Sequence, residues 1–283
     1  MAAIGIHLPQ LVPLPTAAAL ATAVDCAVAA ERLGFDAVSV NDHVVYHSPW
    51  LDGPALLAAA AARTSRVALA TTVLLPALRG AAVSAPTLDA INLLSGGRLV
   101  VGVGAGSHRA DHEACGVPFE RRGAALEAAI AVLRERTTSR PPIWVASWGG
   151  AAGLRRVARL GDGWVASAYA TGPEAFAAHR RTLDDLLEEE GRDPAAFGNV
   201  VATLFFYIAG DRRTAEHVIA RTLAPALGRT AADLLPQCAA GSAEEVAERI
   251  REYADAGAQR IHLWPAADPL EQIEALAAVT TRA

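Results

Sequence analysis

The adjacent side chains of Asp42 and His43 give this sequence its clearest candidates for proton chemistry. A histidine can donate or accept a proton near neutral pH, and a neighbouring carboxylate can orient it or hydrogen-bond the ring of a cofactor. The pair directly follows an apolar run at residues 37–40, which predicts a position at the end of a strand. The alternative is that the two polar side chains only cap a loop.

A glycine-rich stretch at residues 102–106 offers a second place for a ligand, because glycine lets a backbone approach one closely. The candidate contacts are Gly104, Ala105, Gly106 and Ser107. The stretch is not a dinucleotide-binding fingerprint, since Ser107 or Arg109 stands where the third glycine is required. A plain tight turn is the alternative.

Two loops rich in small residues, at 146–150 and 166–172, open onto predicted helix N-termini. Backbone N–H groups at such places bind phosphate. The candidate residues are Ala146, Ser147, Gly149, Ala166 and Ser167. Ordinary short connections are the alternative.

Three tryptophans, Trp50, Trp148 and Trp264, lie at or beyond predicted strand ends and can line an apolar pocket for a ring-shaped ligand. We assign His7, in the first predicted strand, to the same substrate pocket. The alternative is that these aromatic side chains only pack at the rim of the fold. The pocket predicts a small organic molecule as the substrate.

All 25 basic side chains are arginine, and the absence of lysine excludes lysine Schiff-base chemistry and the P-loop. The net charge of −5 argues against a general nucleic-acid binder. The chain has three widely spaced cysteines, no apolar run of membrane-spanning length and no leader pattern. We therefore expect a cytoplasmic protein with no membrane span.

A metal site is conceivable at His108 and His112, which stand one helical turn apart with Asp111 and Glu113 nearby. The HExxH pattern of zinc proteases is absent from the sequence, however. We therefore expect a solvated loop here and no metal ion.

Short apolar runs alternate with alanine-rich amphipathic segments along the chain, which predicts alternating strands and helices. The predicted strands are 3–8, 37–40, 67–75, 99–103, 143–146, 163–167, 200–208 and 260–264. The predicted helices are 16–33, 54–63, 85–94, 121–135, 150–160, 173–190, 243–256 and 269–279, with a further helical stretch near 213–240 after the seventh strand.

Eight such repeats favour an α/β fold of the (β/α)8 TIM-barrel type over a doubly wound open sheet. We expect one barrel domain over residues 1–283, with a helical insertion after strand seven. Active sites of these barrels lie at the carboxyl ends of the strands. The candidate residues above follow strands, so the barrel would bring them together.

Five segments, in order, resemble the luciferase-like family of flavin and deazaflavin oxidoreductases. They are residues 34–43, 95–106, 116–123, 142–145 and 161–164. The resemblance covers nearly the whole chain and implies a TIM barrel with an insertion after strand seven and a homodimer. Family members use FMN or the deazaflavin coenzyme F420. Asp-His after strand two looks like the F420 branch, because the FMN branch more often has Glu-His-His.

The resemblance also implies roles for individual residues. Asp42 would hydrogen-bond near the deazaflavin ring, and His43 would be the catalytic acid or base. Thr72 and Val73 match the position of a non-proline cis peptide bond behind the ring. The loops of small residues would hold the tail of the cofactor and its phosphate. Arginines that could assist them are Arg79, Arg109 and Arg155.

The expected function is F420-dependent hydride transfer between the cofactor and a small organic substrate. One alternative is an FMN-dependent monooxygenase that uses reduced flavin and oxygen. A second is a flavin- or deazaflavin-binding protein without catalytic activity. Ser107 motivates this last alternative, because a sugar-phosphate-oxidising member of the family has a catalytic glutamate at the matching position.

Overall fold

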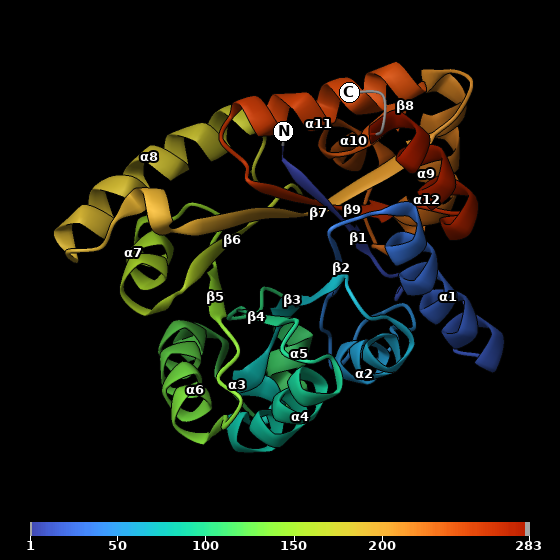
Figure 1. Ribbon diagram of the computed structural model, residues 1–283. Helices are drawn as coiled ribbons and strands as arrows, with labels where there is room; N and C mark the ends of the chain where they lie inside the picture. Colours follow the sequence, from blue (N-terminus) through green and yellow to red (C-terminus); the bar gives the residue numbers. More distant parts are fainter. Residues whose placement is uncertain (1, 281–283) are drawn as a thin grey trace.

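The computed structural model describes residues 2–280, in which nine parallel strands form one sheet (Figure 1). They are β1 (Ala3–His7), β2 (Ala37–Val40), β3 (Ala68–Leu74), β4 (Leu99–Val103), β5 (Ile143–Ala146), β6 (Gly163–Ser167), β7 (Gly198–Ile208), β8 (Ala239–Gly241) and β9 (Arg260–Pro265). Because β6 also pairs with β7, and β9 with both β7 and β1, eight of the strands close into a barrel. The predicted TIM barrel is confirmed.

Helices surround the barrel (Figure 1). They are α1 (Ala17–Leu33), α2 (Gly53–Arg63), α3 (Pro76–Arg79), α4 (Ala81–Leu94), α5 (Arg109–Ala114), α6 (Arg122–Arg136), α7 (Ala151–Leu160), α8 (Pro173–Glu189), α9 (Arg212–Ala226), α10 (Ala231–Leu234), α11 (Ala243–Asp255) and α12 (Pro269–Thr280), with short 3-10 turns at Phe119–Arg121, Pro194–Ala196 and Leu235–Gln237. Within residues 2–280, none is long and apolar enough to cross a membrane.

Local sequence signals explain where several of these helices begin and end. Ser242 and Glu245 form a capping box that starts α11, and Gly34 ends α1 with a φ of 87° that glycine adopts without strain. The sequence prediction starts α4 at residue 85, but the structure extends this helix over Pro86 back to Ala81.

Two predictions about secondary structure are wrong. The stretch at 213–240 is not helical to its end, because β7 runs past the barrel to Ile208 and leaves a free edge, on which β8 pairs in parallel. The expected solvated loop at 108–113 is instead largely the short helix α5, in which Asp111 and His112 are 1% and 0% exposed.

Two histidines of the barrel core are fully buried. His7 of β1 stacks on Trp264 with ring centroids 3.6 Å apart, and the ring of His262 of β9 covers Gly5, where a Cβ would lie 2.5 Å from it. Burial disfavours the charged imidazolium, so the pKa of His7 falls to about 3 and that of His262 to about 4. Both rings therefore stay neutral in the folded protein.

Acidification is expected to destabilise the fold through these two rings. Below pH ~6.5 these two histidines bind protons in the unfolded chain but not in the folded protein. The free energy of unfolding therefore decreases as the pH falls toward the pKa values of the folded rings. Replacing His262 with Leu removes one such group and should flatten the dependence of the melting temperature on pH between about pH 7 and about pH 4.5. If the melting temperature of the His262→Leu variant depended on pH as steeply as that of the wild type, His262 would not be one of the groups that destabilise the fold in acid.

Candidate active site

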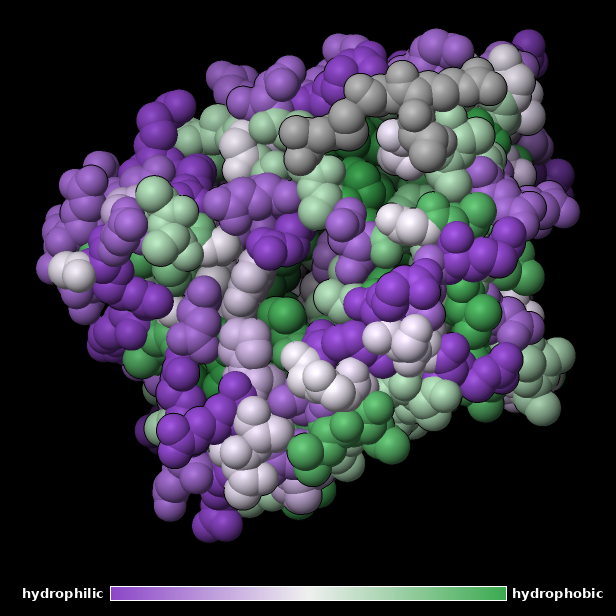
Figure 2. Space-filling model, in the orientation of Figure 1, coloured by the Kyte–Doolittle hydropathy of each residue, from purple (hydrophilic) through white to green (hydrophobic). Residues whose placement is uncertain are grey.

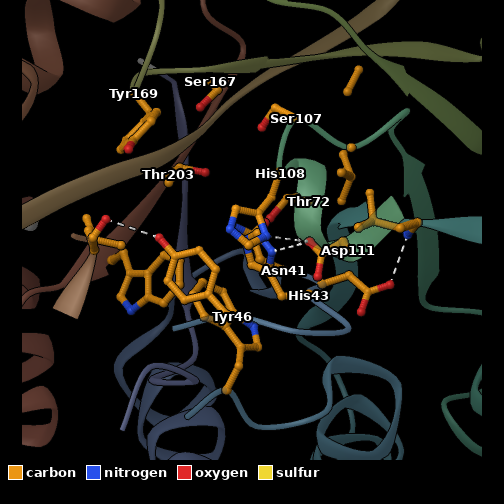
Figure 3. Close-up of a pocket in the computed structure, with 18 of the residues that line it drawn as sticks. Asn41, His43, Tyr46, Thr72, Ser107, His108, Asp111, Ser167, Tyr169 and Thr203 are labelled. Atoms are coloured by element: carbon orange, nitrogen blue, oxygen red, sulfur yellow. Dashed lines mark hydrogen bonds and ion pairs between the residues drawn. The ribbon is translucent and has the colours of Figure 1, made fainter. Parts of the chain in front are cut away.

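A cavity of about 470 Å³ opens at the carboxyl ends of the barrel strands. Its walls come from the loops that follow β2 and β4, from β3 and the residue after it, from β7, from the ends of β5, β6 and β9, and from the segment around Leu227 and Gly228 after α9 (Figure 3). The volume lies in the range of pockets that bind small molecules and cofactors.

His43 and Asp111 form a hydrogen-bonded pair in the cavity wall (Figure 3). His43 Nδ1 lies 2.7 Å from Asp111 Oδ2, while Asp111 Oδ1 accepts the backbone N–H groups of Val44 and Val45 at 2.9 and 2.7 Å. Burial raises the pKa of the Asp111 carboxyl, but the hydrogen bonds from His43 and the two amides outweigh it and hold that pKa below its ordinary value. An ionised Asp111 accepts a hydrogen bond from the Nδ1–H group of His43, which leaves Nε2 of that ring as the free acceptor.

Aromatic rings pack around His43 and limit its movement. The rings of Tyr46 and Trp50 have centroids 4.4 and 4.6 Å from that of His43. Tyr46 and Ser48 donate hydrogen bonds to backbone carbonyls at the end of α9, at 3.3 and 2.9 Å. The insertion after β7 thus holds the loop that carries the histidine.

Asp42 lines the cavity, but its carboxylate is fully engaged by protein groups. It accepts two hydrogen bonds from Arg79, both at 2.7 Å, and one from the Leu75 amide at 2.9 Å. The side chain is 2% exposed, and Arg79 also reaches Asp52. Asp42 therefore links the loop after β2 to the loop after β3, and both of its carboxylate oxygens accept hydrogen bonds from protein groups.

The peptide bond between Thr72 and Val73 is cis, as the family resemblance implies, and both residues line the cavity. The pairing of β3 with β4 shifts register between Thr71 and Leu74, around this bond. Gly104 is not among the residues that line the cavity, and a Cβ there would lie 2.6 Å from a methyl carbon of Val73. Its role is to make room for Val73.

A family model described as luciferase-like monooxygenase matches residues 4–260. The chain belongs to this family.

Curated and solved relatives divide between two chemistries. The F420-dependent glucose-6-phosphate dehydrogenase of Amycolatopsis mediterranei is 33% identical over 175 residues, which cover 50% of this chain and 52% of that protein. The chain thus spans about half the length of this relative. An F420-dependent secondary alcohol dehydrogenase bound to an F420–acetone adduct has a TM-score of 0.84 at 20% identity, covering 99% of this chain and 98% of its own. A monooxygenase from Streptomyces bottropensis also has a TM-score of 0.84, at 21% identity, covering 100% of this chain and 99% of its own.

In this luciferase-like protein the remaining predicted site residues divide into two groups. The residues of the first group line the cavity: Gly106, Ser107, Ala146, Ala166, Ser167, Trp50, Trp148 and Trp264. Ala105, Ser147, Gly149 and His7 do not line it. The Ser147 hydroxyl accepts a hydrogen bond from the Gly149 amide at 3.1 Å, and a Cβ on Gly149 would lie 2.0 Å from the His179 ring. Ser147 and Gly149 therefore shape the turn between β5 and α7.

The assignment of His7 to the substrate pocket is corrected by the structure. The side chain is 0% exposed and does not line the cavity; it stacks on Trp264, which does. The arginines that the sequence suggests for the cofactor phosphate are also placed elsewhere by the structure. Arg79 pairs with Asp42, Arg109 pairs with Glu120 at 3.1 Å, and Arg155 is exposed on α7.

Several further residues line the cavity that the sequence does not assign to the cofactor or substrate site, although His108 and Asp111 are considered there as metal ligands. Tyr46, His108, Asp111, Tyr169 and Thr203 all line the cavity (Figure 3). The signal for Asp111 was its position three residues after His108, which a helix brings onto one face. Thr203 has a positive φ of 60°, where β7 shifts its register against β9, and the sequence gives no signal for it.

Proposed function

We propose that this protein is a coenzyme F420-dependent oxidoreductase that moves a hydride between the cofactor and a small organic substrate. The observation that carries the proposal is the His43–Asp111 pair in the wall of a 470 Å³ cavity, which supplies proton transfer where the hydride reaction would occur. The name of the Amycolatopsis relative supports F420 over other cofactors.

The residues present fit a flat ring system with an anionic tail. Thr72 and Val73 provide one wall of the cavity, and Gly106, Ala146 and Ala166 leave space because their side chains are small. The N-cap of α7 is Gly150, which has no side chain that could occupy the N–H groups of the first turn. Its backbone N–H groups are therefore suited to bind a phosphate. When bound, F420 supplies the hydride chemistry.

His43 manages the proton that accompanies hydride transfer. Oxidation of an alcohol releases a hydroxyl proton, which Nε2 of His43 accepts, and the reverse reaction returns it. Asp111 keeps Nδ1 as the donor side of the ring and stabilises the positive charge that forms. Trp50, Trp148 and Trp264 form apolar parts of the wall that favour a small organic substrate.

Turnover separates this function from a role in cofactor binding alone. Purified protein is mixed with reduced F420 and a panel of carbonyl acceptors, or with F420 and a panel of alcohols, while F420 absorbance is followed. Catalysed conversion with at least one substrate is the expected result. Saturable F420 binding without any turnover would instead favour a binding protein that lacks catalytic activity.

An FMN-dependent monooxygenase is the second candidate function. It is favoured by the equal structural similarity of the Streptomyces monooxygenase. Such an enzyme would consume oxygen in the presence of reduced FMN. An oxygen electrode distinguishes it from the F420 enzyme.

We further propose that the protein is a homodimer that pairs through α2 and α4. Val83, Leu93 and Leu94 of α4 are 69%, 71% and 60% exposed, and Figure 2 shows apolar residues over α4 at the lower edge of this face. A groove of about 370 Å³ between α2 and α4 lies beside them. Apolar area of this kind marks an interface.

The variant Leu93→Glu is expected to be monomeric. A charge in the centre of an apolar interface between two copies loses water without gaining a partner. Light scattering on a sizing column measures the mass directly, with the exposed Leu14→Glu as the control. A monomeric wild type, or a variant that dimerises like the wild type, would disprove this interface.

We place the protein in the cytoplasm. Cys26, Cys115 and Cys238 are free thiols, and Cys26 and Cys238 are buried. Free thiols persist in a reducing compartment.

A further inference from the structure

We propose that His43, His108 and Asp111 form a binding site for a divalent transition-metal ion such as Zn²⁺. Each residue offers one ligand atom, and the three atoms lie within 4.8 Å of one another. The residues come from the loop after β2 and from the start of α5, and Figure 3 shows the three side chains converging.

The chemistry of the three ligands suits this class of ion. Two imidazoles and one carboxylate are ligands that Zn²⁺ and related ions prefer, and such sites keep open positions for water or a substrate. His43, His108 and Asp111 all line the cavity, so open positions on the ion would face it.

The nitrogen Nδ1 of His108 is an independent sign of a missing ligand. It is buried and makes no hydrogen bond within the described residues, although Asp111 Oδ2 is 3.5 Å away. A buried ring nitrogen without a partner is costly, and coordination of an ion would satisfy it.

Asp111 is already oriented as a metal ligand would be. Its Oδ1 is held by the amides of Val44 and Val45, so that Oδ2 is presented toward the two histidines. Hydrogen bonds that fix a ligand in this manner strengthen metal binding. Two ligands about 2.0 Å from a tetrahedral Zn²⁺ lie roughly 3.3 Å apart, so the His43–Asp111 distance of 2.7 Å has to open by about 0.6 Å and the His108 ring has to close on the ion.

The sequence spacing places His112 beside His108 as a candidate ligand and, without an HExxH pattern, predicts no metal ion. His112, one turn after His108, is 0% exposed and packs edge-on against Phe119 at 5.1 Å. The fold brings His43 to the site instead, from 65 positions earlier in the chain. That contact could not be read from local spacing.

Bound metal would occupy the place of the proton between His43 and Asp111. Nδ1 of His43 would coordinate the ion, and the ring's remaining proton would sit on Nε2. Nε2 could then no longer accept a proton from a substrate. Reversible inhibition of turnover by Zn²⁺ follows, and this consequence alone rests on the proposed function.

Calorimetric titration of the chelator-treated protein with Zn²⁺, without any cofactor, tests the site. We expect one ion per chain, with affinity reduced at least about tenfold in both His108→Ala and Asp111→Asn. His217→Ala, which removes an exposed histidine of α9, is the matched control and should bind like the wild type. Co²⁺ in place of Zn²⁺ should give visible absorption bands that His108→Ala loses.

Zn²⁺ binding that is equal in the wild type and in His108→Ala would overturn the proposal, as would the absence of saturable binding. The result is separable from the proposed function, because binding is measured without F420. Zn²⁺ binding without F420 turnover would refute only the function, and F420 turnover without Zn²⁺ binding would refute only the metal site. Circular dichroism of each variant checks that a loss of binding is not a loss of fold.

Discussion

Replacing His43 with alanine is expected to lower F420-dependent turnover about a hundredfold, the scale of general acid–base catalysis. The ring is held against Asp111 at 2.7 Å and has one nitrogen left for the substrate. Its removal takes away the proposed proton acceptor but leaves the other residues that line the cavity and the turn between β5 and α7 in place. The dissociation constant for F420 should therefore change by no more than about threefold, since this catalytic contact is made chiefly in the transition state.

Asp111→Asn is the informative companion to this variant. It keeps an oxygen for the amides of Val44 and Val45 but no longer fixes the donor side of the His43 ring. Because the two residues act as a unit, the double variant should be no slower than His43→Ala alone. Unchanged turnover in His43→Ala would remove this histidine from the mechanism.

Asp42→Ala is expected to lower the free energy of unfolding by about 3 kcal/mol, the cost of breaking a buried ion pair at one partner. The variant leaves the Leu75 amide without its acceptor and leaves Arg79, which is 24% exposed, with Asp52 alone. Urea unfolding followed by circular dichroism measures the loss.

Asp52→Asn is the matched control for this effect. It removes the other carboxylate that pairs with Arg79, at an exposed position, while asparagine still caps α2. We expect a loss of less than about 1 kcal/mol. Equal stabilities of the Asp42 and Asp52 variants, together with weaker F420 binding by Asp42→Ala only, would instead assign Asp42 to the cofactor.

The barrel could be predicted from the sequence because its eight strands are short apolar runs separated by amphipathic helices. Strand boundaries agree within two residues, and Thr72–Val73 is cis as the resemblance implied. β8 was missed because a three-residue strand carries no periodicity of its own and forms only where β7 leaves an edge.

The candidate site was predictable at His43 but not at its partner. Asp111 lies in a segment with the polar composition of a loop, and its burial depends on the loop after β2 closing over α5. His7 shows the opposite error. Its position in a strand could not reveal that Trp264 would cover it.

The most direct test of the F420 assignment is an equilibrium titration of the purified protein with F420 and, separately, with FMN, followed by cofactor fluorescence. We predict saturable binding of one F420 per chain and FMN binding that is at least about tenfold weaker. Tight binding of FMN with no binding of F420 would contradict it.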